Sequence, residues 1–283
     1  MREIAWWKKR AVGIAESFFP HPKEWRFEGL DCDLDNLDAK TLTAFLSAKV
    51  SVPPSCLQAW EARIGKLPND IGERYNARLL TPRDWASHFK NVLHRNLLVR
   101  SKTDGGPCRC CNFDREDLIH FGRCERAGQI FKELAGMAEV PQLTEEQWDR
   151  FTLFALTPAE KLPEGWVNLH LLLWKQLIGL LVQIELEGEK FAVSKVWAPT
   201  WIRFERKVLA LKEHVDRRLR RAESRGEQPP QVSKISRCIL PLAEFNDEGS
   251  LVWNKQIVDK IKKLAGLDKN EKRTQVTDGS AES

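Results

Sequence analysis

The feature that most restricts the fold of this chain is the spacing of cysteine and histidine between positions 108 and 124. Cys108 and Cys111 form a C-x2-C pair, and a glycine- and proline-rich bend before them lets both thiolates face one ion. His120 and Cys124 are four residues apart, so on a helix they share one face. Together the four side chains make a closed tetrahedral set. We therefore predict one structural zinc ion bound by Cys108, Cys111, His120 and Cys124.

Cys110 is predicted to be a non-ligand, because the adjacent Cys110 and Cys111 are poorly placed to bind one ion together. The alternative for the whole segment is a chance cluster of reduced thiols beside a surface histidine. The chain has 7 cysteines, an odd number, and charged residues interrupt the apolar positions near its N-terminus, so no signal-peptide core is found there. These features predict an intracellular protein of the nucleus or cytoplasm, where clustered thiols favour metal over disulfides.

Two enzymatic interpretations of the cysteine segment fail. Pro107-Cys108-x-x-Cys111 matches half of a zinc nucleobase deaminase motif, but neither His88 nor His94 is followed by the glutamate that the other half needs. A thioredoxin-like C-x-x-C requires a βαβ setting, and here the motif lies between predicted helices. No catalytic residue is predicted, and the chain is expected not to be an enzyme.

Hydrophobic periodicity predicts a mainly α fold: several packed helices, a small zinc knuckle and a short C-terminal β-hairpin. Thr144 and Gln147 form a capping box that should open a helix. A hairpin is predicted within Ile235–Trp253, followed by a short amphipathic helix. The other predicted helices cover 3–18, 36–49, 55–66, about 82–100, 118–138, 167–186 and 200–224, the last after a break at Pro199.

The predicted organisation has four parts: an N-terminal helical region at 1–78, the zinc-knuckle region at 79–140, a C-terminal helical region with the hairpin at 141–267, and a disordered tail at 268–283. The most apolar stretch, 167–186, contains His170, Lys175 and Glu185. It is therefore predicted to be a buried core helix, with no membrane partner.

Basic residues suggest a nucleic-acid partner, RNA or DNA. The net charge is +5, and arginine and lysine concentrate before, in and well after the cysteine segment. The 11 tryptophans are expected to anchor helix packing, with base stacking as the alternative. The predicted phosphate contacts are Arg83, Lys90, Arg95, Arg100, Lys102, Arg109, Arg217, Arg218, Arg220 and Arg221.

Residues 79–134 resemble the zinc-binding domain that follows the polymerase in non-LTR retrotransposon reverse transcriptases. The matching parts are Trp85–Phe89–Leu93, His94-Arg-Asn-Leu-Leu98, the Cys108/Cys111 pair, Glu116-Asp117-Leu-Ile-His120, Cys124 and Phe131-Lys-Glu-Leu134, with Leu171-Leu-Leu-Trp174-Lys175 beyond them. The Asp-Asp pair of the family's polymerases is absent from this sequence. The resemblance thus implies a detached C-terminal region that contacts nucleic acid without polymerase activity.

Two functions remain open from the sequence. The first is a non-catalytic zinc module that binds nucleic acid through the basic residues above. The second is a zinc-stabilised protein-interaction or scaffold module, in which the basic residues only keep the surface soluble. Acidic neighbours such as Asp114 and Glu125 dilute the positive charge of the cysteine segment and favour the second.

Overall fold

The computed structural model describes residues 55–267, apart from positions 69, 77, 78, 104, 113, 158–161, 229 and 247. These residues belong to a compact unit that begins at Ser55. The helices predicted over 3–18 and 36–49 and the disordered tail predicted from 268 lie outside the described residues. The domain boundaries predicted near 78 and 140 stay predictions.

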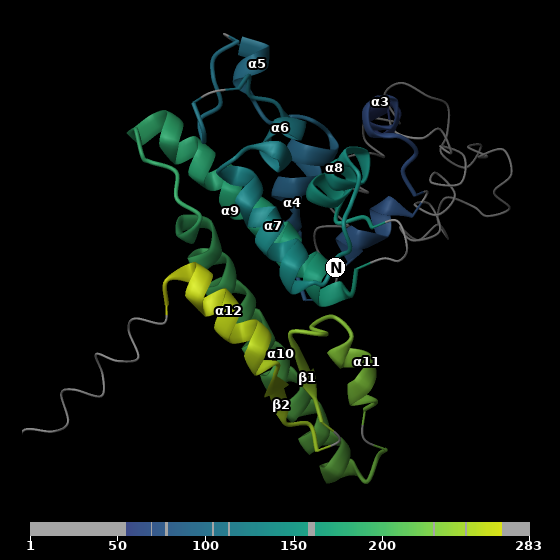
Figure 1. The fold of residues 1–283 in the computed structure, drawn as a ribbon. Coiled ribbons are helices and arrows are strands. Elements are labelled where there is room, and N and C mark those ends of the chain that lie inside the picture. Colours follow the sequence, from purple (N-terminus) through teal and green to yellow (C-terminus); the bar gives the residue numbers. More distant parts are fainter. Residues whose placement is uncertain are drawn as a thin grey trace, which may run out of the picture. The chain divides into compact units, whose positions relative to one another are not determined.

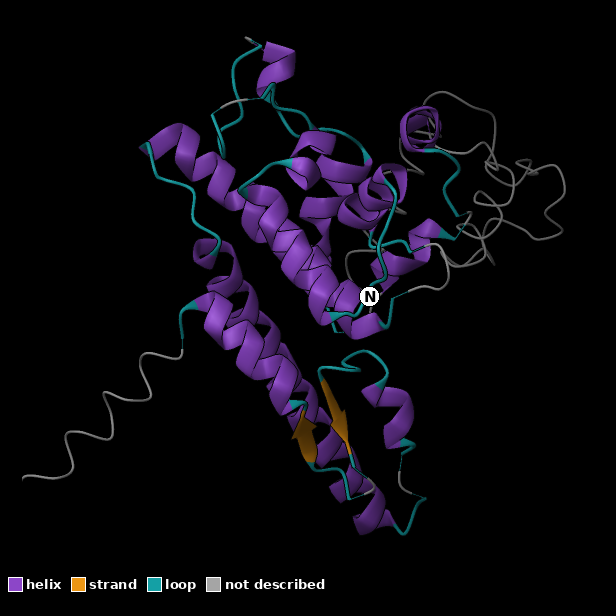
Figure 2. Ribbon diagram, in the orientation of Figure 1, coloured by secondary structure: helices purple, strands orange, loops and turns teal. Residues whose placement is uncertain are grey.

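The fold is mainly helical with one short hairpin near its C-terminal end, as the sequence predicted (Figure 1, Figure 2). The α-helices are α3 (Ser55–Ile64), α4 (Pro82–His88), α5 (Arg100–Thr103), α6 (Leu118–Arg123), α7 (Ala127–Met137), α8 (Glu145–Phe154), α9 (Glu164–Glu187), α10 (Ser194–Arg225), α11 (Val232–Ser236) and α12 (Lys255–Ala265). A 3-10 helix, η3, covers Ile71–Asn76, and a π-helical turn, η4, covers Phe89–Leu93. Strands β1 (Ala243–Phe245) and β2 (Leu251–Trp253) pair antiparallel.

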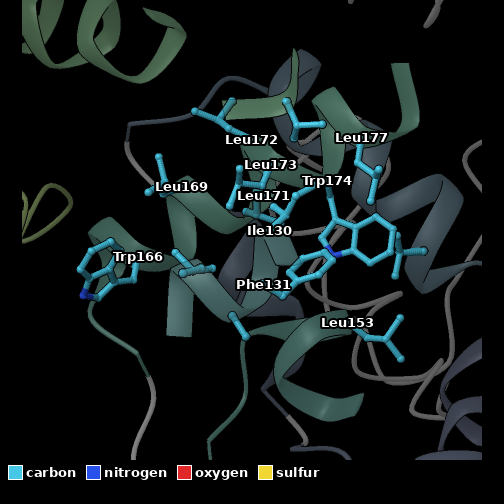
Figure 3. Packing of buried hydrophobic residues seen from close by; sticks show 14 of the residues in the cluster. Ile130, Phe131, Leu153, Trp166, Leu169, Leu171, Leu172, Leu173, Trp174 and Leu177 are labelled. Carbon is cyan, nitrogen blue, oxygen red and sulfur yellow. The ribbon is translucent and has the colours of Figure 1, made fainter. Parts of the chain in front are cut away.

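Helix α9 is the centre of the hydrophobic core, as predicted for the most apolar stretch. Leu171, Leu172 and Trp174 are fully buried, and the Trp174 ring lies 5.3 Å from the ring of Phe131 on α7 (Figure 3). Within the described part of the chain, α9 is the one helix long and apolar enough to cross a membrane. Its burial against α4 and α10 accounts for this composition by packing.

Two buried histidines join α9 and α4 to the end of α8. His88 receives a hydrogen bond from the Tyr75 hydroxyl and donates through Nε2 to the Leu153 carbonyl at 2.7 Å. His170 donates to the Thr152 carbonyl at 2.8 Å, and burial lowers its pKa to about 3. Both are fully buried, and burial also lowers the pKa of His88, so they are neutral structural residues at neutral pH.

The basic helix predicted to run to about Arg100 ends earlier. α4 continues only as the π-helical turn η4 and stops at Leu93. The buried Trp60 indole donates to the carbonyls of Val92 and Leu93, at 3.2 and 3.0 Å, and so occupies acceptors that a longer helix would use. Arg95 then adopts a left-handed φ of 54°, which turns the chain. The predicted basic residues on either side of this turn therefore do not share one helix face.

The break predicted at Pro199 is also wrong, because α10 runs through this residue from Ser194 to Arg225. Proline lacks only the hydrogen bond to the residue four positions before it, which here lies in the first turn of the helix. Trp197 and Trp201 flank it on the buried face and are 0% and 1% exposed. Their burial outweighs one missing hydrogen bond near a helix end.

The C-terminal hairpin is shorter than predicted. Ala243 pairs with Trp253 and Phe245 with Leu251, while Cys238–Leu242 forms a turn after α11. α12 follows as predicted, begins at an Asn254 cap and lies along α10 (Figure 1). The Thr144–Gln147 capping box that opens α8 is confirmed, with the two hydrogen bonds at 3.3 and 2.9 Å.

A buried carboxylate fastens α4 to α9 and α10. Asp84 is fully buried and lies within 3.2 Å of Lys175, 2.7 Å of Arg203 and 2.6 Å of Lys207. Thr81 donates to the same carboxylate through its hydroxyl at 2.7 Å and its N–H at 3.0 Å. Residues more than 90 positions apart are thus joined by one side chain.

Candidate metal centre

The cysteine-rich turn is closed by its own backbone. Pro107 and Arg115 form an isolated antiparallel bridge, and the Cys108 N–H donates to the Asp114 carbonyl at 2.8 Å. The Asn112 N–H donates to the Cys108 carbonyl at 2.8 Å, and Asn112 has a left-handed φ of 63°. Asparagine tolerates this conformation better than most residues. We call residues 107–124 the knuckle, and this turn is the half that carries Cys108 and Cys111.

The other half is the short helix α6. Asp117 is its N-cap, and its Oδ1 accepts the His120 N–H at 2.7 Å. The chain leaves α6 at Cys124 and re-enters helix at Ala127, so the single helix predicted over 118–138 is two helices. The break turns the chain at Cys124 while leaving His120 within α6, and the Ala127 N–H donates to the Cys124 sulfur at 3.5 Å.

The four predicted ligands come together. Their ligand atoms all lie within 4.8 Å of one another, and Cys111 Sγ is 3.5 Å from His120 Nε2. A sulfur and a nitrogen bound tetrahedrally to one zinc ion would be about 3.5 Å apart, given bond lengths near 2.3 and 2.0 Å. The three cysteines are at most 4% exposed. Cys108, Cys111, His120 and Cys124 therefore form a possible metal site.

The pKa shifts of these sulfurs favour thiolate at Cys124 and thiol at Cys108 and Cys110. The Cys110 N–H donates to the Cys108 sulfur at 3.3 Å. Hydrogen bonds from the Cys108 and Cys110 thiols hold the pKa of Cys124 well below its ordinary value. The pKa of Cys110 is raised, mainly by its hydrogen bond with Cys108 and also by burial, so Cys110 is a neutral thiol. It lies outside the four-residue cluster.

A buried ion pair outside the four-residue cluster stabilises the knuckle. Glu116 is fully buried and accepts from the backbone N–H groups of Arg100 and Arg109, at 3.1 and 2.9 Å. The Arg109 guanidinium forms an ion pair with the same carboxylate, with Nη2 2.6 Å from Oε1 of Glu116. The Arg109 side chain is 7% exposed. It also donates to the carbonyls of Leu98 and Leu181, which ties the knuckle to α9.

The predicted phosphate contacts therefore fall into two groups. Arg109 is occupied by Glu116, and Arg100 by Glu185 and the Pro107 carbonyl, so both serve the fold. The others are at least partly exposed. They are Arg83 on α4, Lys90 on η4, Arg95 in the turn after η4 and Lys102 on α5, and near the end of α10 they are Arg217, Arg218, Arg220 and Arg221.

Sequence reasoning overlooked Glu116 and Asp117 as structural partners of the site. Asp117 carried a usable signal, because an aspartate three residues before His120 has the spacing of a helix cap. No sequence signal identified Glu116, since a glutamate in a charged segment is usually solvent-exposed. No protein-family model matches this chain, and no curated protein or solved structure is significantly similar to it.

Proposed function

We propose that this chain is a non-catalytic zinc-knuckle protein that binds nucleic acid. The observation that carries the proposal is the convergence of Cys108, Cys111, His120 and Cys124, whose ligand atoms lie within 4.8 Å of one another. Three thiolates and one imidazole are a donor set that favours zinc over hard cations such as magnesium.

A structural role for the metal follows from the donor set. Four protein ligands complete a tetrahedron and leave no position for water or substrate, which a catalytic zinc site keeps. Glu116, the one buried carboxylate of the knuckle, is held by Arg109 and two backbone amides. It is therefore not available as a general base, and zinc would stabilise the turn and α6 relative to one another.

Nucleic acid is the partner that the surface chemistry supports best. Four arginines, Arg217, Arg218, Arg220 and Arg221, are exposed near the end of α10, and no ion pair joins them to another described residue. Guanidinium groups bind phosphate by paired hydrogen bonds and release counterions from the polymer. The resemblance of residues 79–134 to the zinc-binding domain of non-LTR retrotransposon reverse transcriptases agrees with this role.

A scaffold role is the second candidate, favoured by the internal use of Arg100 and Arg109. Both guanidinium groups bind carboxylates and carbonyls of this chain. The basic residues nearest the metal site are therefore less available to bind phosphate. In that case zinc would hold the helices in register for a protein partner.

The first test is the metal content of the purified protein beside that of Cys111→Ser. We expect about one zinc per chain in the wild type and a large loss in the variant, with Cys56→Ser as a control because Cys56 lies on α3 outside the cluster. A metal-free wild type prepared without chelator would remove the ligand assignment.

Affinity for a labelled single-stranded 20-nucleotide RNA and for duplex DNA, measured between 50 and 200 mM salt, separates the two candidates. Nucleic-acid binding predicts a dissociation constant that rises steeply with salt. A zinc-loaded protein that binds neither polymer at 50 mM salt would favour the scaffold role.

A further inference from the structure

A cavity of about 250 Å³ opens beside the knuckle, and its charge is strongly positive. Arg63 of α3, Arg95 of the turn after η4, Lys102 of α5 and Arg115 of the knuckle line it. Asp117 is the one carboxylate among the described residues of the lining. Four cations and one anion leave three positive charges around a space that can hold a phosphate group.

Two of the cations, Lys102 and Arg115, are held in place by groups that do not neutralise them. Lys102 donates to the Arg95 carbonyl at 2.9 Å, and Arg115 donates to the Ser101 carbonyl at 2.8 Å. Each uses one donor and retains others, because an ammonium has three N–H groups and a guanidinium has five. Neutral carbonyls fix their positions and leave their charge available to an anion.

The other two cations, Arg63 and Arg95, lie against an aromatic ring. The guanidinium carbons of Arg63 and Arg95 lie 5.9 and 5.5 Å from the ring centre of Trp60, which is fully buried. Cation–π contact of this kind orients a guanidinium without using its N–H donors, of which Arg63 gives one to Asp117. Trp60 is also fixed, through its indole N–H, by the two carbonyls of η4. The arginines are thus preorganised.

We propose that this cavity, which we call the basic pocket, is a phosphate-binding site that takes a backbone phosphate of nucleic acid. The proposal rests on the proposed function for the source of that phosphate. It adds Arg63 and Arg115 to the phosphate contacts predicted from sequence and places Arg95 and Lys102 in the same binding site. Preorganised cations with unused donors are the feature that binds phosphate tightly, since little side-chain entropy is lost on binding.

Asp117 connects the basic pocket to the metal site. Its Oδ2 accepts from Arg63 at 3.2 Å, and its Oδ1 accepts the N–H of the ligand His120 at 2.7 Å. Arg115 belongs to the bridge that closes the cysteine turn. One wall of the pocket is therefore part of the knuckle, so zinc would shape the pocket without touching the anion.

The decisive experiment compares salt dependence of binding to the 20-nucleotide RNA for three proteins. Lys102→Gln/Arg115→Gln removes two pocket cations, and Lys260→Gln/Lys263→Gln removes the same charge from the exposed face of α12. We expect the slope of log affinity against log salt to fall by about 1.4 in the pocket variant, which is about 25-fold in affinity at 0.1 M salt. The α12 variant should keep the wild-type slope.

Zinc content and circular dichroism of each variant check its folding, and Arg95→Gln provides a second pocket variant that leaves the knuckle sequence intact. A pocket variant that folds, holds zinc and keeps the wild-type slope overturns the pocket while the proposed function stands. If the wild type binds no polymer, the proposed function fails, and ³¹P NMR of inorganic phosphate decides the pocket. If the wild type broadens the phosphate signal and Lys102→Gln/Arg115→Gln does not, the result supports the basic pocket. If the wild type causes no broadening, the basic pocket is overturned.

Discussion

Glu116 in the knuckle and Asp84 at the junction of α4, α9 and α10 are both fully buried carboxylates, but their cations differ. Glu116 faces one guanidinium, that of Arg109, which is 7% exposed. Asp84 faces three cations, Lys175, Arg203 and Lys207, whose side chains are 20%, 42% and 19% exposed. The first pair is enclosed, whereas the second set reaches water.

The free-energy cost of removing a buried carboxylate depends on whether its cationic partners can regain contact with water afterwards. Arg109 without Glu116 would be a buried charge whose remaining carboxylate partner is Glu185, 3.9 Å away and half exposed, and such a weakly compensated charge is expensive in a low-dielectric interior. The three partners of Asp84 can turn outward and recover hydration because each is already partly exposed. The same chemical change should therefore be far more damaging in the knuckle.

The largest effect is expected for Glu116→Gln. We predict a loss of about 3–5 kcal/mol in the free energy of unfolding, the usual cost of leaving one member of a buried ion pair alone. Urea denaturation of the zinc-loaded protein measures it. The double variant Arg109→Met/Glu116→Gln should recover part of the loss, because it removes the stranded charge. A single variant within 1 kcal/mol of the wild type, on the same scale, would contradict the enclosed pair.

A smaller loss, about 1–3 kcal/mol, is expected for Asp84→Asn. The same denaturation experiment compares it with Glu116→Gln. If the two losses were equal, or their order reversed, partial exposure of the cations would not be the deciding factor.

The Asp84 contribution should also have a defined pH range. Burial alone would raise the pKa of Asp84, but hydrogen bonds from Lys207, Thr81 and Arg203 outweigh it and hold the pKa well below its ordinary value. A depressed carboxylate pKa stabilises the fold above the unfolded pKa, about 3.9, and this contribution is lost as pH falls below it. The difference between wild type and Asp84→Asn should therefore be constant from about pH 8 to 5 and shrink below about pH 4.

The smallest effect is expected for Thr81→Ala, about 1 kcal/mol. The change removes the hydroxyl that donates to Asp84 at 2.7 Å but keeps the backbone donor. In the Asp84→Asn background the loss should be smaller, since a hydrogen bond to a charged acceptor is about twice as strong as one to a neutral acceptor. A double-mutant cycle measures this coupling, and strict additivity would count against Thr81 as a partner of the charge.

Local patterns in the sequence predicted much of what is local in the structure. The spacing of Cys108, Cys111, His120 and Cys124 identified the cluster because turn and helix geometry alone bring each pair together. The Thr144 cap is equally local, since both of its hydrogen bonds span three residues. The position of the apolar helix α9 followed from composition alone.

Features that depend on distant residues were missed. The early end of the basic helix depends on Trp60, which reaches Val92 from 32 positions away, and no pattern near Val92 announces it. Arg63 reaches Asp117 across 54 positions, so the basic pocket could not be recognised from either segment. At Pro199 the sequence predicted a break where the helix is continuous. The tendency of proline to end a helix takes no account of the burial of Trp197 and Trp201, which keeps α10 continuous.

The two oxygens of Asp117 have a consequence for thermodynamics. One accepts from the backbone of His120 and the other from the guanidinium of Arg63. Metal binding at His120 or anion binding at Arg63 would therefore alter the carboxylate that holds the other residue. Coupling free energies between two binding events are reciprocal. Whatever factor zinc contributes to the affinity of an anion at Arg63, that anion contributes to the affinity for zinc. The anion of the surrounding buffer would thus become a variable in the affinity of the knuckle for zinc.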